Sequence, residues 1–395
     1  MLEVCNCPGP MSGGLARRSG LFLSYRHAFK RVLTLDTGDV FWIEPNDMRN
    51  RFVLKGYEKM GYDVVALGDQ EWALQDRLLN EYLSGDSVTY LSSGICGENP
   101  VPRLRKVVKK EWKDFRVAIV NHVGDGAFLF FDSNKKSGLK ISPLGKLREI
   151  VSRLDDQGWF VVVVIHGTEH DLQEDMKRLG GDLFIQGHIR NSRNQIRWIG
   201  KKPVISVGSP DYVGAAAVDI DKNGELAGID YRRELVDERW PSDSWMLELY
   251  QAYAHAAMRE AIASERKKDL NYVPSSRCGQ CHRPRYETWQ KSAHARAWNS
   301  LQEAGRSIDP NCVMCHSLGF MKKGGFYTWE KTPTLAGVHC QSCHKFNADH
   351  KKTNFNPPRP GEKVCRTCHT PITDPHFDGA MKKRFETMGC GKSKH

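Results

Sequence analysis

The C-terminal third of the sequence repeats the pattern Cys-x-x-Cys-His four times. The copies are Cys278/Cys281/His282, Cys312/Cys315/His316, Cys340/Cys343/His344 and Cys365/Cys368/His369. Two thiols at this spacing can bond to the two vinyl groups of one porphyrin, and the adjacent imidazole can ligate the iron. Structural zinc sites built from paired Cys-x-x-Cys units are the alternative, but they leave the four histidines without a role. We therefore predict four covalently bound c-type haems, with the four motif histidines as proximal iron ligands.

A chain that carries c-type haems has to be exported, because this haem is attached outside the cytoplasmic membrane. The opening segment MLEVCNCPGPMSGG lacks the basic region and apolar stretch of a secretory signal, so the signal peptide is not visible in it. We expect that a leader has been removed or that the start is misassigned. The sequence has no run of about 18 consecutive apolar residues, so we predict no membrane span. The expected location is periplasmic or extracellular.

The charge balance predicts redox partner proteins and no nucleic-acid partner. The formal net charge is +11, which by itself would suit an acidic polymer. Each haem carries two propionates, so four haems offset about eight of these charges. Lysine pairs such as Lys109-Lys110 and Lys382-Lys383 are then interpreted as solvated faces or as docking patches for an acidic redox partner.

Histidines outside the motifs are candidates for the distal iron ligands. In the same region these are His294, His339, His350, His376 and the terminal His395. The first four are our distal candidates, although each has the alternative of being an ordinary surface histidine. Methionines are rival ligands but more often fill gaps beside haem edges. The number of these histidines nearly matches the four irons. This favours bis-histidine ligation, which leaves no vacant iron position for substrate.

Residues Cys278 to Asp378 resemble the tetrahaem cytochromes of the cytochrome c554 type. The resemblance is carried by Trp289 with SAHARAW, by DPNCVMCHSLGF, by GGFYTWEKTPTLAGVHCQSCH, and by VCRTCH followed by DPHFD. It implies closely packed haems, distal ligation by His294 and His350, and relay of several electrons. The stretch CHKFNAD after the third motif departs from the family pattern, which leaves the local ligand of that haem open.

Residues 1–240 alternate between apolar strands and helical stretches, which predicts an α/β layered sandwich. The expected strands are Val32 to Leu35, Asp63 to Leu67, Val117 to Val120, Phe160 to Ile165, Asp182 to Ile185 and Val204 to Val207. The expected helices are Arg49 to Met60, Glu71 to Leu83, Leu144 to Gln157 and Leu172 to Leu179. Residues 241–270 are interpreted as a linker containing a helix from Ser244 to Lys268. Residues 271–395 are expected to form a mainly α, loop-rich tetrahaem cytochrome c domain.

Four residues of types that commonly bind metals follow expected strands of the N-terminal region. They are Asp39, Asp69, His166 and His188. The carboxyl ends of neighbouring parallel strands meet at one edge of a sheet, so these side chains are expected to converge on a metal. The alternative is four unrelated loop residues.

The order and context of these segments, together with GGLARR, resemble the 5'-nucleotidase type of calcineurin-like metallophosphoesterases. The resemblance implies two metals and a bridging hydroxide. At the first metal position the family's ligands are replaced by Cys5, Cys7 and Arg190, while Asp39, Asp69, His166 and His188 supply the other. Gln70 stands where the family has the histidine that assists phosphoryl transfer. We expect this site to hold one divalent metal or none, and we expect no phosphoesterase activity.

Three functions remain open at this point. The favoured one is an exported electron carrier in which an inactive phosphoesterase-like domain serves as a scaffold or docking body. The second is a redox enzyme with one open haem site that acts on a small nitrogen or sulfur compound. The third is a polymerising cytochrome, a homo-oligomer or filament that conducts electrons along its length.

Overall fold

The structure is a computed structural model that describes most of the chain. The described residues are 12–41, 47–74, 81–83, 88–96, 104–129, 138–189, 195–263, 272–320, 322, 324–344, 360–370, 374 and 377. They form two compact units that divide between Tyr250 and Gln251, inside helix α8. No helix among the described residues has the length and apolar character needed to cross a membrane.

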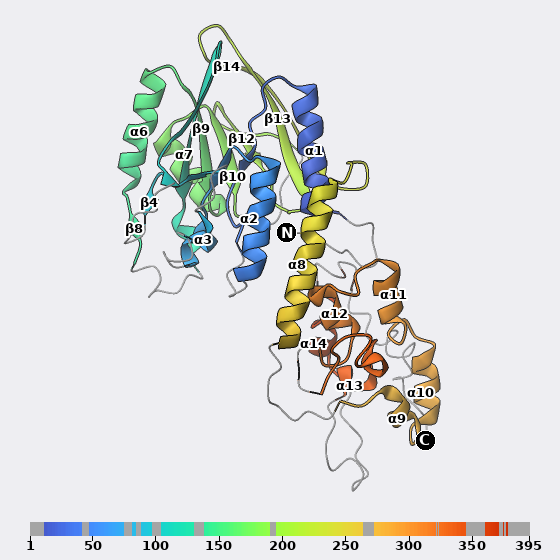
Figure 1. The fold of residues 1–395 in the computed structure, drawn as a ribbon. Coiled ribbons are helices and arrows are strands. Elements are labelled where there is room, and N and C mark those ends of the chain that lie inside the picture. The colour runs from blue at the N-terminus through green and yellow to red at the C-terminus, as the bar shows by residue number, and fades with distance from the viewer. Residues whose placement is uncertain are drawn as a thin grey trace. The chain divides into compact units, whose positions relative to one another are not determined.

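The first unit contains the following helices and strands in chain order, the last of which, α8, continues into the second unit (Figure 1). They are α1 (Leu15–Ala28), β1 (Leu35–Asp36), α2 (Asp47–Met60), β2 (Val64–Ala66), α3 (Asp69–Ala73), β3 (Thr89–Leu91), β4 (Ile95–Cys96), β5 (Leu104–Arg105), β6 (Val108–Trp112), β7 (Phe115–Val123), β8 (Lys140–Ile141), α6 (Leu144–Asp156), β9 (Phe160–His166), α7 (Glu169–Leu179), β10 (Leu183–Gly187), β11 (Arg197–Ile199), β12 (Lys202–Ser206), β13 (Tyr212–Ile220), β14 (Leu226–Leu235) and α8 (Ser244–Ala263).

Two main sheets organise this unit. One is a four-stranded parallel sheet in the order β1-β2-β3-β5, and the other is a six-stranded mixed sheet in the order β11-β12-β10-β9-β7-β6. The central strands β7, β9 and β10 run parallel to one another. The parallel strands of each sheet therefore bring their carboxyl ends to one edge.

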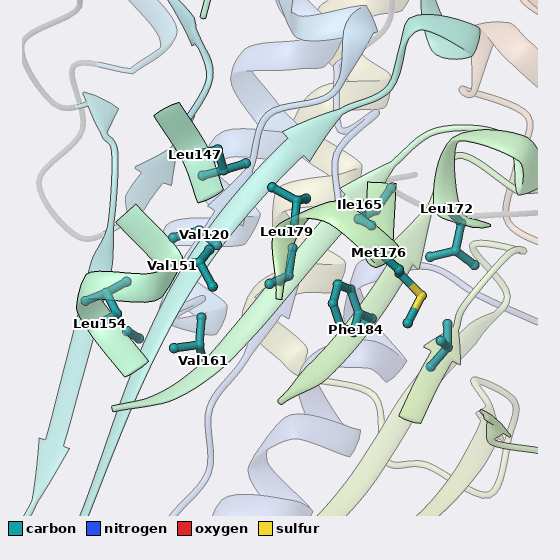
Figure 2. Packing of buried hydrophobic residues seen from close by; sticks show 13 residues of the cluster. Val120, Leu147, Val151, Leu154, Val161, Ile165, Leu172, Met176, Leu179 and Phe184 are labelled. Atoms are coloured by element: carbon teal, nitrogen blue, oxygen red, sulfur yellow. The ribbon is translucent and has the colours of Figure 1, made fainter. Parts of the chain in front are cut away.

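Strand β9 shows how the sheets pack, because its apolar residues alternate between two cores. Phe160, Val162 and Val164 face a core that also contains Val64 and Ala66 of the other sheet. Val161, Val163 and Ile165 face a second core, whose helical members are Leu147, Val151 and Leu154 of α6 and Leu172, Met176 and Leu179 of α7. Figure 2 shows these helix side chains converging on the sheet. Both faces of β9 are buried, and the predicted α/β sandwich is confirmed.

The second unit is built of short helices joined by loops. Its elements are α9 (Ser275–Gly279), α10 (Arg283–Gln290), α11 (Ala297–Glu303), α12 (Pro310–His316), α13 (Cys340–Cys343) and α14 (Glu362–Cys365), with a 3-10 turn at Pro333–Leu335. Its apolar cluster is small and centres on Trp298, whose ring lies 4.7 Å from that of Phe326. The expected mainly α, loop-rich architecture is confirmed for the described residues.

Most of the predicted elements differ from the structure by up to three residues at their ends, and one differs by more. The strand expected at Val32 begins only at Leu35, because the Thr34 N–H donates to the Asp63 carboxylate at 2.8 Å instead of to a neighbouring strand. The helix expected from Glu71 to Leu83 begins at Asp69 and stops before Leu74, whose backbone is extended. The end of the helix expected to reach Lys268 lies outside the described residues.

Candidate haem and metal sites

Each Cys-x-x-Cys-His motif folds into a helical turn. The histidine N–H donates to the carbonyl of the first cysteine in three of them, from His282, His344 and His369, at 2.8–2.9 Å. The second motif lies within α12 and ends at His316. Residues three and four apart share a helix face, so both thiols and the imidazole of one motif point to the same side. This is the arrangement that attachment to one porphyrin edge requires.

Cys281 differs from the other seven motif cysteines in its burial. Its side chain is exposed, whereas the other seven are half-buried. The cause is local, because Cys281 lies in the turn after α9, where its N–H donates to the Cys278 carbonyl at 3.2 Å and the adjacent His282 is exposed as well. Protein atoms therefore do not enclose this thiol as they partly enclose the others. A porphyrin bonded there would itself cover the sulfur, and haem attachment at Cys281 stays a prediction.

The motifs approach one another in two pairs. The Cys278 thiol of the first motif approaches the Cys340 thiol of the third and lowers its pKa, and the Cys340 N–H donates to Ser275 Oγ in α9 at 3.0 Å. The Cys315 thiol of the second motif likewise approaches the Cys368 thiol of the fourth and lowers the pKa of Cys368. The first and third motifs therefore lie side by side, as do the second and fourth.

Two motif histidines have one ring nitrogen fixed and the other left for a ligand. His316 Nδ1 donates to the Ala297 carbonyl at 2.6 Å, and His369 Nδ1 donates to Asp374 Oδ2 at 2.8 Å. Metal-binding histidines commonly carry such an Nδ1–H contact, which fixes the tautomer and leaves Nε2 for the ion. His344 Nδ1 is buried with no hydrogen-bond partner in the described part of the chain. The residues present therefore fit haem iron.

The candidates for distal iron ligands lie in different surroundings. The His294 ring lies 6.0 Å from the ring of His369, and burial together with the charges of His369 and His316 lowers its pKa. A neutral imidazole is the form that ligates iron. His339 is buried and has both ring nitrogens engaged: Nδ1 accepts from the Ser275 N–H at 3.1 Å, and Nε2 donates to the Ala336 carbonyl at 3.0 Å. This pattern favours a structural role for His339. His350 and His376 lie outside the described residues.

In the first unit, four predicted side chains come together. Asp39 follows β1, Asp69 begins α3 after β2, His166 ends β9, and His188 directly follows β10. One ligand atom from each lies within 4.8 Å of all the others. The convergence arises because all four positions are at the carboxyl ends of parallel strands. Cys5, Cys7 and Arg190 lie outside the described residues.

The two carboxylates and two imidazoles hold one another by charge. His166 Nε2 lies 3.0 Å from Asp69 Oδ1, and His188 Nδ1 lies 3.3 Å from Asp39 Oδ2. Burial of His166 opposes its charged form, but contacts with Asp39 and Asp69 outweigh it and raise its pKa to about 10. The same carboxylates raise the pKa of His188 to about 9. The same two carboxylates would also attract a divalent cation to this donor set.

Backbone strain and an unused acceptor distinguish the cluster from an ordinary ion pair. Asp39 and His188 are the two non-glycine residues with positive φ in the described part of the chain, at 61° and 56°. Strained residues of this kind gather at functional sites. Asp39 Oδ1 is buried and accepts no hydrogen bond there, although His166 Nε2 is 3.3 Å away. His166 Nδ1 donates to the Thr37 carbonyl at 2.7 Å, which leaves Nε2 for an ion. The four residues fit a metal.

A buried carboxylate fixes the loops that carry both aspartates. Glu71 is fully buried, and its side chain accepts the N–H groups of Asp39, Val40, Phe41 and Gly68 at 2.7–3.1 Å. Gly68 also packs against the His166 ring, since a Cβ at this position would lie 2.5 Å from two of its atoms. Sequence reasoning missed the role of Glu71, although its place two residues after Asp69 was the available signal.

Comparison with known proteins covers the two parts of the chain separately. Residues 277–345, which include three motifs, match the family described as cytochrome c554 and c-prime. Cytochrome c-554 of Nitrosomonas europaea is 33% identical over 117 residues, covering 25% of this chain and 50% of that protein. The chain thus spans about half the length of this curated relative. The resemblance proposed from the motifs is confirmed for this segment.

Solved structures resemble the N-terminal part. A 5'-nucleotidase precursor from Thermus thermophilus superposes with a TM-score of 0.58 at 24% identity, covering 65% of this chain and 57% of that one. Sulfate thiohydrolase SoxB from Thermus thermophilus gives a TM-score of 0.56 at 17% identity, covering 67% and 49%. At these identities the likeness shows the fold. The chain joins a metallophosphoesterase-like α/β fold to a segment that is similar to cytochrome c554.

Proposed function

We propose that the protein is an exported multihaem cytochrome that carries electrons through four haems c. The observation that carries this proposal is that each of the four motifs folds into a helical turn, in which residues three and four apart share one face. The match to cytochrome c554 and c-prime supports it over residues 277–345. Side-by-side placement of motifs one with three, and two with four, supports closely spaced haems and electron relay within the domain. Redox partner proteins would supply and accept the electrons.

The test of this proposal is the haem content of the purified, matured protein. We expect four haems per chain by pyridine haemochrome assay, and a low-spin reduced-minus-oxidised spectrum. A count below three, or zinc bound at the motifs, would contradict the proposal. A high-spin fraction would instead favour the redox enzyme with an open haem site.

We further propose that the N-terminal domain is a scaffold or docking body that retains one divalent metal, held by Asp39, Asp69, His166 and His188. The ion would replace the protons that now hold the two imidazoles between the carboxylates. Two nitrogen and two oxygen donors suit zinc or manganese better than calcium, which prefers oxygen ligands alone.

The metal proposal predicts a difference between two histidines of the same domain. His166→Ala is expected to weaken metal binding by more than about 100-fold, because loss of a supporting contact alone costs 10–100-fold. His122→Ala is the matched control, since His122 pairs with Asp175 at 3.1 Å and belongs to no group of metal-ligand candidates among the described residues. Metal retained after dialysis, measured by mass spectrometry of the elements, distinguishes them. Equal metal content in both variants would refute the site.

A further inference from the structure

The second and fourth motif histidines differ in what accepts their Nδ1 proton. For His316 the acceptor is the neutral backbone carbonyl of Ala297, at 2.6 Å. For His369 it is the carboxylate of Asp374, at 2.8 Å. Asp374 is five residues beyond His369, and its own N–H donates to the Thr370 carbonyl at 2.8 Å, which holds it in place. Phe377 stacks on the His369 ring at 4.9 Å and restricts its rotation.

A carboxylate acceptor changes the electronic character of the histidine. It draws the Nδ1 proton towards itself, so the ring gains anionic character and donates more strongly through Nε2. The carboxylate also places a negative charge close to the iron, in a position where its side chain is only 13% exposed and solvent screens it little. Both effects favour ferric over ferrous iron, and hydrogen bonding to the axial ligand is a recognised means of setting haem potential.

We propose that Asp374 is a positioning residue that lowers the reduction potential of the haem bound through His369. The inference rests on the proposed haem binding. Reduction of this haem takes one electron from an external donor and converts ferric to ferrous iron. No bond forms or breaks, and the Nδ1 proton stays within its hydrogen bond. The chain thereby makes the fourth haem harder to reduce than it would be with a neutral acceptor, such as the one that serves His316.

The experiment is a potentiometric titration of the full, matured chain, with dithionite as reductant and haem absorbance as the signal. In Asp374→Asn, which keeps an acceptor oxygen but removes the charge, one of four one-electron steps is expected to shift to more positive potential. The other three steps stay in place. Electron paramagnetic resonance of the ferric protein should show changed g-values for the same single haem.

Glu362→Gln is the matched control, because it removes the same charge three residues before Cys365. Glu362 bonds to Arg366 at 3.0 Å, and no hydrogen bond or ion pair joins it to His369 in the described part of the chain. An equal shift in this control, or unchanged potentials in Asp374→Asn with four haems present, would overturn the inference. Loss of one haem in Asp374→Asn or in Asp374→Glu would make Asp374 a residue for folding or haem attachment and overturn it. A wild-type chain without haem would instead refute the proposed function.

Discussion

Replacing His294 with alanine is expected to leave four haems attached and to turn one of them high-spin. Attachment persists because the thioether bonds do not involve His294. The iron loses its sixth ligand, so its spin state changes and its potential rises, since bis-histidine ligation generally gives low potentials. Electronic absorption and paramagnetic resonance of the ferric protein would show a high-spin signal equal to one haem in four.

We expect this effect at the haem of the fourth motif. With metal–nitrogen bonds of about 2 Å on each side, two imidazoles that share one ion have ring centres roughly 6 Å apart. The His294 and His369 rings are 6.0 Å apart and steeply inclined, at 70°. The two rings therefore already have the spacing of an axial pair.

His339→Ala is the control for this prediction. His339 is buried, but Ser275 and Ala336 occupy both of its ring nitrogens, so its loss is expected to lower stability and leave every haem low-spin. The cost is about 1–3 kcal/mol, typical of buried polar groups left without a partner. A low-spin spectrum in His294→Ala, or a high-spin haem in His339→Ala, would show that the two roles were assigned the wrong way round.

The central strands were predictable from sequence because burial on both faces leaves a continuous apolar run. Residues 160–165 contain no polar residue, and all six are buried in the structure. The long hairpin β13–β14 has no such signal. Residues such as Asp219, Asp230 and Arg232 interrupt its apolar positions, and much of it is exposed. Its pairing is set by register between two segments, which the composition of either segment does not reveal.

The convergence of the four candidate metal ligands could be predicted for a related reason. A ligand at the end of a predicted parallel strand has a defined place, so Asp39, Asp69, His166 and His188 could be expected to meet. Glu71 and Asp374 could not be found in this way. Their importance depends on which groups they face: four backbone N–H groups from two loops for Glu71, and the Nδ1 nitrogen of a motif histidine for Asp374. Such partners are known only once the backbone is placed.

Hydrolysis of phosphate esters is expected to be absent. The resemblance to metallophosphoesterases implies two metals, but the described residues bring together donors for one. With one ion, the bound water is less acidic, and the charge that develops on the phosphoryl oxygens is stabilised by one cation instead of two. Gln70 cannot supply the proton that a histidine would, which costs roughly another 10²–10⁴-fold.

The assay is turnover of an aryl phosphate ester and of nucleoside monophosphates by protein supplied with manganese, zinc or cobalt. Gln70→His is expected to remain inactive, because it restores the assisting group without the second metal. Asp39→Asn is the decisive control. Asparagine tolerates the positive φ of 61° at this position, so the variant removes the carboxylate charge without a conflict in the backbone. Turnover that is present in the wild type and disappears in Asp39→Asn would show that the one-metal site is catalytic and that the protein is a hydrolase joined to an electron carrier.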